Sequence, residues 1–265
     1  MKIEQANQLT EQALDKLIRA LEAGQSETLK AYLAMMSRFR RYSWGNILLI
    51  AFQRPDAAYV AGFNRWKELG RNVKKGEKGI TILAPITACK HKENDPAEEH
   101  HVLVGVKPVH VFALDQTEGK PLPEFAKISG DPKDHTERLK RYIAELDIAL
   151  EYSTDIAPAK GISTSEKIVL LPDLPLAEEF STLVHELAHS LLHRGERRSE
   201  TTRTTRETEA EAVAFVVSSA IGLDPGSASS DYIQLYRGDR QTLMESLQFI
   251  QQTSSLILTA ISAGE

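Results

Sequence analysis

The chain has 265 residues, of which 42% are hydrophobic and 26% are charged, and its net charge is −5. This composition is ordinary for a globular protein of one or two domains, and no apolar run reaches the roughly 18 residues that would predict a membrane span. The lone Cys89 excludes an internal disulfide and the first residues lack the apolar core of a signal peptide, so we expect a cytoplasmic protein.

Positive and negative charges are unequally distributed along the chain. Residues 1–93 hold 16 Lys and Arg against 9 Asp and Glu, whereas residues 94–265 hold 16 against 28. Opposite charge balances predict two modules with different partners. Nucleic acid is the usual partner of a positive surface, so the N-terminal module is the candidate for nucleic-acid binding.

The N-terminal half is predicted to combine helices with an antiparallel sheet. Residues 4–23 and 26–41 have the periodicity of amphipathic helices, and the apolar segment 44–52 predicts a third helix. Residues 80–85 and 102–113 alternate or run apolar and are rich in β-branched residues, as strands are.

Two polar segments are expected to connect these elements. Residues 91–101 are charged and contain Pro96, which predicts a surface hairpin loop between the strands. Residues 116–132 are rich in Gly and Pro and are the predicted linker between the modules. We therefore expect one domain over residues 1–127 and another over residues 128–265.

Cations alternate with aromatic residues in residues 37–46 (SRFRRYSWGN) and 63–78 (FNRWKELGRNVKKGEK). Aromatic faces stack on unpaired bases while Lys and Arg neutralise phosphates, and each stacked base contributes about 1–3 kcal/mol. This mixture favours single strands, because no helix-turn-helix or zinc-finger signature is present. The alternative is that Trp44 and Trp66 are core residues and that the lysines lie on a solvated hairpin. The candidate DNA-binding residues are Arg38, Arg40, Arg41, Trp44, Asn46, Arg65, Trp66, Lys67, Arg71, Lys74, Lys75 and Lys78.

The C-terminal half is predicted to be mainly helical with a small sheet. Residues 136–150 read as a helix, 161–163 and 167–171 as a short hairpin, and 230–262 as one or two helices. Between them, an apolar helix carries residues 185–189, which read HELAH. In metallopeptidases with this motif, an edge strand before the helix pairs with the substrate backbone.

The HELAH segment is the strongest chemical signal in the chain. Histidines four residues apart project from one helix face, so His185 and His189 can bind one metal ion. Glu186 is then placed to hold and deprotonate a water molecule at that ion. Catalytic zinc sites usually take three protein ligands and keep one position open, so a third ligand is needed.

Residues 206–217 are predicted to be a second helix that supplies this ligand. The arrangement resembles the gluzincin metallopeptidases, whose second helix often carries Glu-x-x-Ala. That pattern fits residues 209–212 (EAEA), so the resemblance implies Glu209, although Val213 stands where such families often have Asp or Asn. Glu207 and Glu211 share a helix face and are the alternatives. His193 would lie about 12 Å along the helix axis from His185, so we expect a helix-end residue rather than a ligand.

Several front-half segments resemble the N-terminal domain of ArdC-type antirestriction proteins. They are residues 43–47 (SWGNI), 59–66 (YVAGFNRW), 70–80 (GRNVKKGEKGI) and Pro85, with 115–117 (DQT) and 122–123 (LP) at the end of the domain. The resemblance implies a single-stranded-DNA-binding domain joined to a metallopeptidase-like domain. It also implies that the protein shields incoming plasmid or phage DNA from host restriction.

Together these patterns predict an α+β protein that joins a helical and antiparallel-sheet domain to a mainly helical, zincin-like domain. We expect one Zn²⁺, or another divalent ion, at His185, His189 and Glu209, with Glu186 as the catalytic base. The partners are single-stranded DNA and a protein or peptide substrate, with no membrane. The alternative is a peptidase resembling ImmA, in which the N-terminal half recruits a regulatory protein for cleavage. A purely structural zinc site is disfavoured, because such a site needs no base and closes its fourth position.

Overall fold

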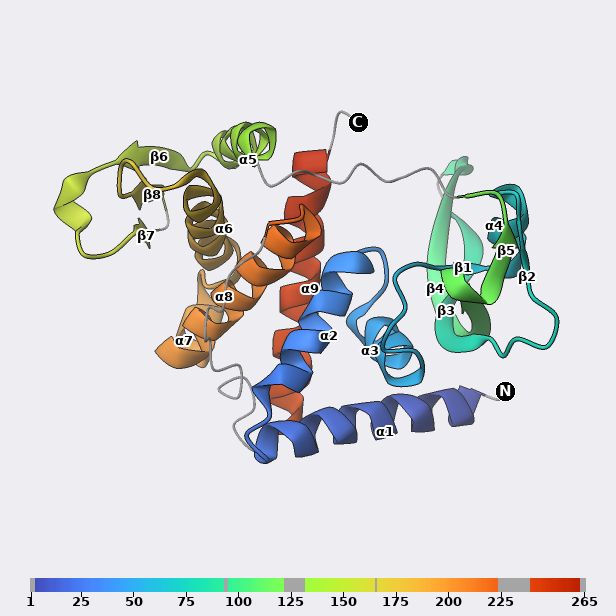
Figure 1. Ribbon diagram of the computed structural model, residues 1–265. Helices are drawn as coiled ribbons and strands as arrows, with labels where there is room; N and C mark the ends of the chain where they lie inside the picture. The colour runs from blue at the N-terminus through green and yellow to red at the C-terminus, as the bar shows by residue number, and fades with distance from the viewer. Residues whose placement is uncertain (1–2, 93–94, 122–131, 165, 224–238, 263–265) are drawn as a thin grey trace. The chain divides into compact units, whose positions relative to one another are not determined.

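The computed structural model describes residues 3–92, 95–121, 132–164, 166–223 and 239–262 (Figure 1). Its contacts define two compact units. Unit 1 comprises Met1–Lys16 and Gly45–Pro123, and unit 2 comprises Leu17–Trp44 and Glu124–Glu265. The protein is α+β, as predicted, and none of the described helices is long and apolar enough to span a membrane.

Unit 1 is built around a three-stranded antiparallel sheet in the order β1-β4-β3. A two-stranded ribbon of β2 and β5 and two helices complete it. The elements are α3 (Trp44–Gln53), β1 (Val60–Gly62), α4 (Phe63–Glu68), β2 (Arg71–Val73), β3 (Ile80–Lys92), β4 (Asp95–Ala113), the short 3-10 helix η1 (Leu114–Gln116) and β5 (Thr117–Gly119).

Side chains of α3 pair with the backbone of edge strand β3. The Asn46 amide donates to the Leu83 carbonyl and accepts from the Leu83 N–H, both at 2.8 Å. Gln53 makes the same pair of bonds with Thr81, both at 2.9 Å. Two amides on the same face of α3, two turns apart, thus bind backbone groups at the outer edge of β3.

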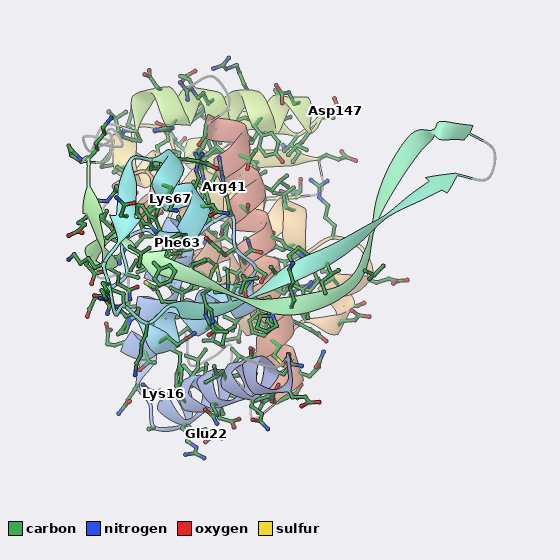
Figure 2. All side chains as sticks on the ribbon, turned by 90° about the vertical axis from the view of Figure 1, so that its right-hand side faces the viewer. Lys16, Glu22, Arg41, Phe63, Lys67 and Asp147 are labelled. Carbon is green, nitrogen blue, oxygen red and sulfur yellow. The ribbon has the colours of Figure 1, made fainter. Side chains whose placement is uncertain are left out.

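The hairpin of β3 and β4 differs from the prediction. Residues 91–101 were expected to be a loop, but β3 continues to Lys92 and β4 begins at Asp95, with a register shift after His91. Pro96 is tolerated because β1 pairs only with residues 111–113 of β4, so Pro96 needs no donor on that side. Figure 2 shows this hairpin as a long twisted ribbon.

Unit 2 places a helical cluster beside a small mixed sheet in the order β6-β8-β7. Its helices are α2 (Ser26–Arg38), α5 (Lys133–Glu145), α6 (Leu176–Leu192), α7 (Glu196–Glu200), α8 (Arg203–Ala220) and α9 (Arg240–Ser262). Its strands are β6 (Ala149–Tyr152), β7 (Gly161–Ser163) and β8 (Lys167–Leu170). β7 and β8 form the predicted antiparallel pair, whereas the end of the predicted helix 136–150 is strand β6, because Asp147 turns the chain with φ 55°.

The helix α2 groups with unit 2 although it lies early in the sequence. It contacts α8, and after it Arg40 donates to the Leu258 carbonyl and the Ser262 hydroxyl of α9. The helix α1 (Ile3–Glu22) contributes to both units. The domain boundary after residue 127 therefore stays a prediction. Of the predicted linker 116–132, residues 122–131 lie outside the described residues, and residues 117–119 form β5.

Candidate metal centre

Three potential metal ligands from two neighbouring helices converge in unit 2. His185 and His189 lie one turn apart on α6, and Glu207 lies in the first half of α8, which packs against α6 (Figure 1). One nitrogen of each histidine and one oxygen of Glu207 all lie within 4.8 Å of one another. The two Nε2 atoms are 3.1 Å apart, and Glu207 Oε2 lies 3.6 Å from His185 Nε2 and 3.4 Å from His189 Nε2. This is a donor set of two imidazoles and one carboxylate.

The third ligand predicted from the sequence, Glu209, is not part of this cluster. An α-helix turns about 100° per residue, so Glu207 and Glu211 share a face while Glu209 points to nearly the opposite side. Accordingly, Glu207 and Glu211 face His185, at 3.6 and 3.4 Å, whereas the Glu209 side chain is fully buried. The structure therefore places Glu207, one of the two alternatives, beside the two histidines, and it places Glu209 elsewhere.

Glu209 is instead the centre of a buried polar network. Arg197 of α7 donates two hydrogen bonds to its two carboxylate oxygens, at 2.9 and 2.8 Å. Ser246 of α9 donates a third at 2.6 Å, and His193 Nε2 lies 2.9 Å from Oε2. Burial favours the neutral acid, but these donors hold the pKa of Glu209 below its usual range. This carboxylate therefore ties α6, α7, α8 and α9 together.

His193 ends α6 as its C-terminal cap, as the sequence predicted, and does not join the ligand cluster. Its side chain is fully buried between His189 and Glu209. Burial lowers the pKa of His193, although Glu209 opposes the shift. No pattern in the sequence predicts this buried position of the His193 side chain.

The charges around the cluster show whether it would accommodate a cation. Burial disfavours a charged His185, yet hydrogen bonds with Glu207 and Glu211 raise its pKa to about 9. Hydrogen bonds from His185 and His189 hold the pKa of Glu207 well below its usual range. The two carboxylates thus favour positive charge at the imidazoles, and a divalent ion between these donors would meet the same demand.

Glu186 lies between the two histidines in sequence and is buried. It packs against strand β7, since a Cβ added to Gly161 would lie 2.7 Å from Glu186 Cγ and 2.8 Å from Oε1. Only glycine fits at this position without moving the carboxylate. β7 is one of the two edge strands of its sheet, so an edge strand runs directly beside Glu186.

The candidate DNA-binding residues fall into two groups. Trp66 is fully buried, and its Nε1 donates to the Phe112 carbonyl at 3.0 Å, so this tryptophan is a core residue and the prediction that it stacks on bases is wrong. Asn46, Arg40 and Arg71 are bound to the protein's own backbone, Arg71 through the carbonyls of Thr117 and Lys120. Trp44 is half-buried. The exposed candidates are Arg38, Arg41, Arg65, Lys67, Lys74, Lys75 and Lys78. Of these, Lys74 also donates a hydrogen bond to the Asp115 carbonyl at 2.9 Å.

Sequence reasoning missed one exposed aromatic residue of unit 1. Phe63, at the start of α4, is 47% exposed, and Lys67 Nζ lies 4.9 Å from its ring centroid. Figure 2 labels both residues. Phe63 lies in the same basic segment as Trp66. We predicted Trp66 as the stacking residue because the sequence pattern does not distinguish the buried face of this short helix from its exposed face.

Comparisons with known proteins agree with this two-part organisation. Residues 7–116 match the family described as the N-terminal domain of anti-restriction factor ArdC, and residues 137–245 match the IrrE N-terminal-like domain of the M78 peptidases. The chain thus joins a peptidase-like domain to a second domain of a different family. The predicted resemblance to ArdC-type antirestriction proteins is confirmed for the N-terminal half, and the C-terminal half matches a peptidase family, as the resemblance implied.

Two solved structures and one curated relative are similar over nearly the whole chain. The metal-free crystal structure of ArdC from plasmid R388 is 22% identical, with a TM-score of 0.57, and the match covers 97% of this chain and 98% of that one. Its Mn(II)-bound form is 20% identical, with the same TM-score, over 97% and 99%. These likenesses show a common fold. The uncharacterized protein pXO2-81 of Bacillus anthracis is 25% identical over 97% of this chain, which spans about half (52%) of that relative.

Proposed function

We propose that unit 2 contains a metal-dependent peptidase centre in which His185, His189 and Glu207 hold one divalent ion. The convergence of their three ligand atoms within 4.8 Å carries the proposal. Two histidines and a glutamate are a frequent set at catalytic zinc, which leaves one position open, so Zn²⁺ is the ion proposed. Mn²⁺ is the alternative, because R388 ArdC binds Mn(II).

The residues around the site fit peptide hydrolysis. A bound divalent ion would supply Lewis acidity toward a carbonyl group. Glu186 accepts the proton of the attacking water and passes it to the leaving amine. The free edge of β7, which lies beside Glu186 at Gly161, offers backbone donors and acceptors to an extended peptide.

Replacing Glu207 by alanine is expected to weaken zinc binding by about 100-fold. Structural zinc sites with four ligands bind with roughly 10–16 kcal/mol, so one ligand accounts for roughly 3 kcal/mol. Zinc affinity is measured by competition with a chelating dye. Glu211→Ala is the matched control, since Glu211 lies one turn later and approaches Nδ1 of His185 rather than Nε2. We expect a smaller loss for Glu211→Ala, and equal affinities of Glu207→Ala and the parent would refute the ligand set.

For unit 1 we propose binding of single-stranded DNA, and for the whole chain the protection of incoming DNA from restriction. The match of residues 7–116 to the ArdC N-terminal domain supports this proposal. The exposed lysines Lys74, Lys75 and Lys78 follow one another between β2 and β3 and can neutralise phosphates. Phe63 beside Lys67 is the exposed ring on which a base can stack.

The combined change Lys74→Ala/Lys75→Ala/Lys78→Ala is expected to weaken binding of an oligothymidine. It should also reduce the slope of log K against log salt concentration by about 2, because each phosphate contact on a single strand contributes about 0.7 to this slope. Fluorescence anisotropy over a range of salt concentrations measures both quantities. The control is Lys140→Ala/Lys160→Ala/Lys167→Ala, which removes the same charge from lysines paired with glutamates in unit 2. If both triple variants lower the slope equally, the lysines of unit 1 are not the contact site.

A second candidate is an ImmA-like peptidase whose front half recruits a protein. The match of residues 137–245 to the IrrE N-terminal-like domain favours it. The two candidates differ in a cell-based restriction assay. Loss of protection in a Glu186→Gln strain makes hydrolysis part of protection, whereas loss only with the unit 1 lysine variant places protection in DNA binding.

A further inference from the structure

We propose that His193 and Glu209 form a positioning chain that fixes the ring of His189 with its Nε2 directed at the metal. The inference rests on the proposed metal centre and assigns a role to two residues that do not touch the ion. The chain runs from His189 Nδ1 to His193 Nδ1 at 3.0 Å, and from His193 Nε2 to Glu209 Oε2 at 2.9 Å. The side chains of His193 and Glu209 are both 0% exposed.

The proton positions along this chain follow from its far end. Glu209 receives two hydrogen bonds from the Arg197 guanidinium and one from Ser246, so it is a carboxylate that only accepts. His193 Nε2 must therefore carry a proton and donate it to Glu209. In the neutral ring Nδ1 then has a lone pair and accepts from His189, whose single proton lies on Nδ1. His189 Nε2 is left with a free lone pair on the side that faces His185 and Glu207.

The far end of the chain, the Glu209 carboxylate, is bound to Arg197, which has a further contact of its own. The Arg197 guanidinium carbon lies 3.8 Å from the centroid of the Phe249 ring on α9, so Arg197 is held by a ring on one side and by Glu209 on the other. The chain thus begins in α9 and α7 and ends at a ligand on α6. Partners of this kind set the tautomer of a metal-binding histidine and the orientation of its ring.

The other histidine ligand is held differently. His185 Nδ1 faces Glu211 at 3.4 Å, and the Glu211 side chain is 31% exposed. If Glu211 is removed, a water molecule can take its place as the hydrogen-bond partner of His185. No water molecule reaches the buried position of His193, so its hydrogen bond to His189 cannot be replaced in this way. The structure therefore predicts that metal affinity depends more on His193 than on Glu211.

The tautomers can be measured on the unaltered protein. In ¹⁵N NMR spectra of the zinc-loaded full chain, we expect His189 to carry its proton on Nδ1 and His193 to carry its proton on Nε2, with slow exchange of both protons. If His189 is protonated on Nε2, or His193 on Nδ1 alone, the positioning chain is wrong. Failure of the parent to bind zinc would instead reject the proposed metal centre, so the two failures are distinguishable.

Variants at His193 separate positioning from packing. His193→Phe fills the buried space but accepts no hydrogen bond, and we expect zinc affinity to fall about 10–100-fold. His193→Asn fills the space less well, but its side-chain oxygen can take the place of Nδ1 and accept from His189. We therefore expect His193→Asn to retain more zinc affinity than His193→Phe.

A pure packing role predicts the opposite order of these two variants, and that order would overturn the inference. Ser218→Ala is the control, because Ser218 is buried in α8 and its hydroxyl has no hydrogen-bond partner among the described residues. It should leave zinc affinity unchanged. If a His193 variant does not fold, as judged by circular dichroism without metal, the tautomers of the unaltered protein still decide the question.

Discussion

Glu186→Gln is expected to lower the rate of peptide hydrolysis by at least about 100-fold and to leave zinc affinity within a factor of about two of the parent's. General acid–base catalysis contributes about 10²–10⁴-fold, and glutamine cannot accept the proton. The side chain keeps its size, so its contact with Gly161 is preserved. Turnover of a pool of fluorogenic peptides by the zinc-loaded full chain measures the rate.

The matched control for this change is Glu178→Gln on the same helix. Glu178 lies at the start of α6, two turns before Glu186, and forms an ion pair with Lys160. Its replacement by glutamine should not affect hydrolysis. Gly161→Ala provides a second variant, because its added Cβ must displace the Glu186 carboxylate, and it should lower turnover without lowering zinc affinity. A Glu186→Gln protein as active as the parent would exclude Glu186 as the base. A zinc-loaded parent without turnover on any peptide would exclude an active peptidase.

Glu209→Ala is expected to reduce the free energy of unfolding by about 3–5 kcal/mol, the usual cost of removing one partner from a buried ion pair. The change leaves the Arg197 guanidinium and the His193 ring without their carboxylate and leaves the Ser246 hydroxyl without its acceptor. Urea denaturation of the metal-free protein measures this loss, so that metal binding does not contribute to the free energy.

Glu207→Ala is the contrasting variant in the same experiment. The Glu207 side chain is 53% exposed, so without metal its removal should cost less than about 1 kcal/mol. The two glutamates should therefore have opposite profiles, with Glu209 important for stability and Glu207 for metal affinity. Similar unfolding free energies for the two variants would contradict the division of roles that we propose for these glutamates.

The HELAH helix and the shared face of its two histidines could be predicted because i and i+4 spacing determines which side chains share a face. The same rule identifies Glu207 and Glu211 as one face, but it cannot say which face of α8 meets α6. The observed face is favoured by Arg197, because its guanidinium pairs with the buried Glu209 carboxylate. A contact between α7 and α8 leaves no periodic pattern in the sequence. The Glu-x-x-Ala resemblance therefore indicated Glu209, whereas the structure places Glu207 beside the two histidines.

In the front half, composition identified a basic and aromatic segment but not the direction of its side chains. Trp66 and Phe63 lie three residues apart on a helix of six residues, and the former packs in the core while the latter is exposed. Asn46 likewise reads as a polar surface residue, whereas its amide completes the edge of β3. Tertiary pairing determines these roles, and local sequence does not encode it.

A crystal structure of the zinc-loaded protein with an anomalous difference map tests the central claim most directly. We expect one peak about 2.0–2.2 Å from His185 Nε2, His189 Nε2 and a Glu207 oxygen, with Glu209 still bound to Arg197. A peak coordinated by Glu209, or the absence of a peak at the two histidines in zinc-saturated crystals, would contradict the account.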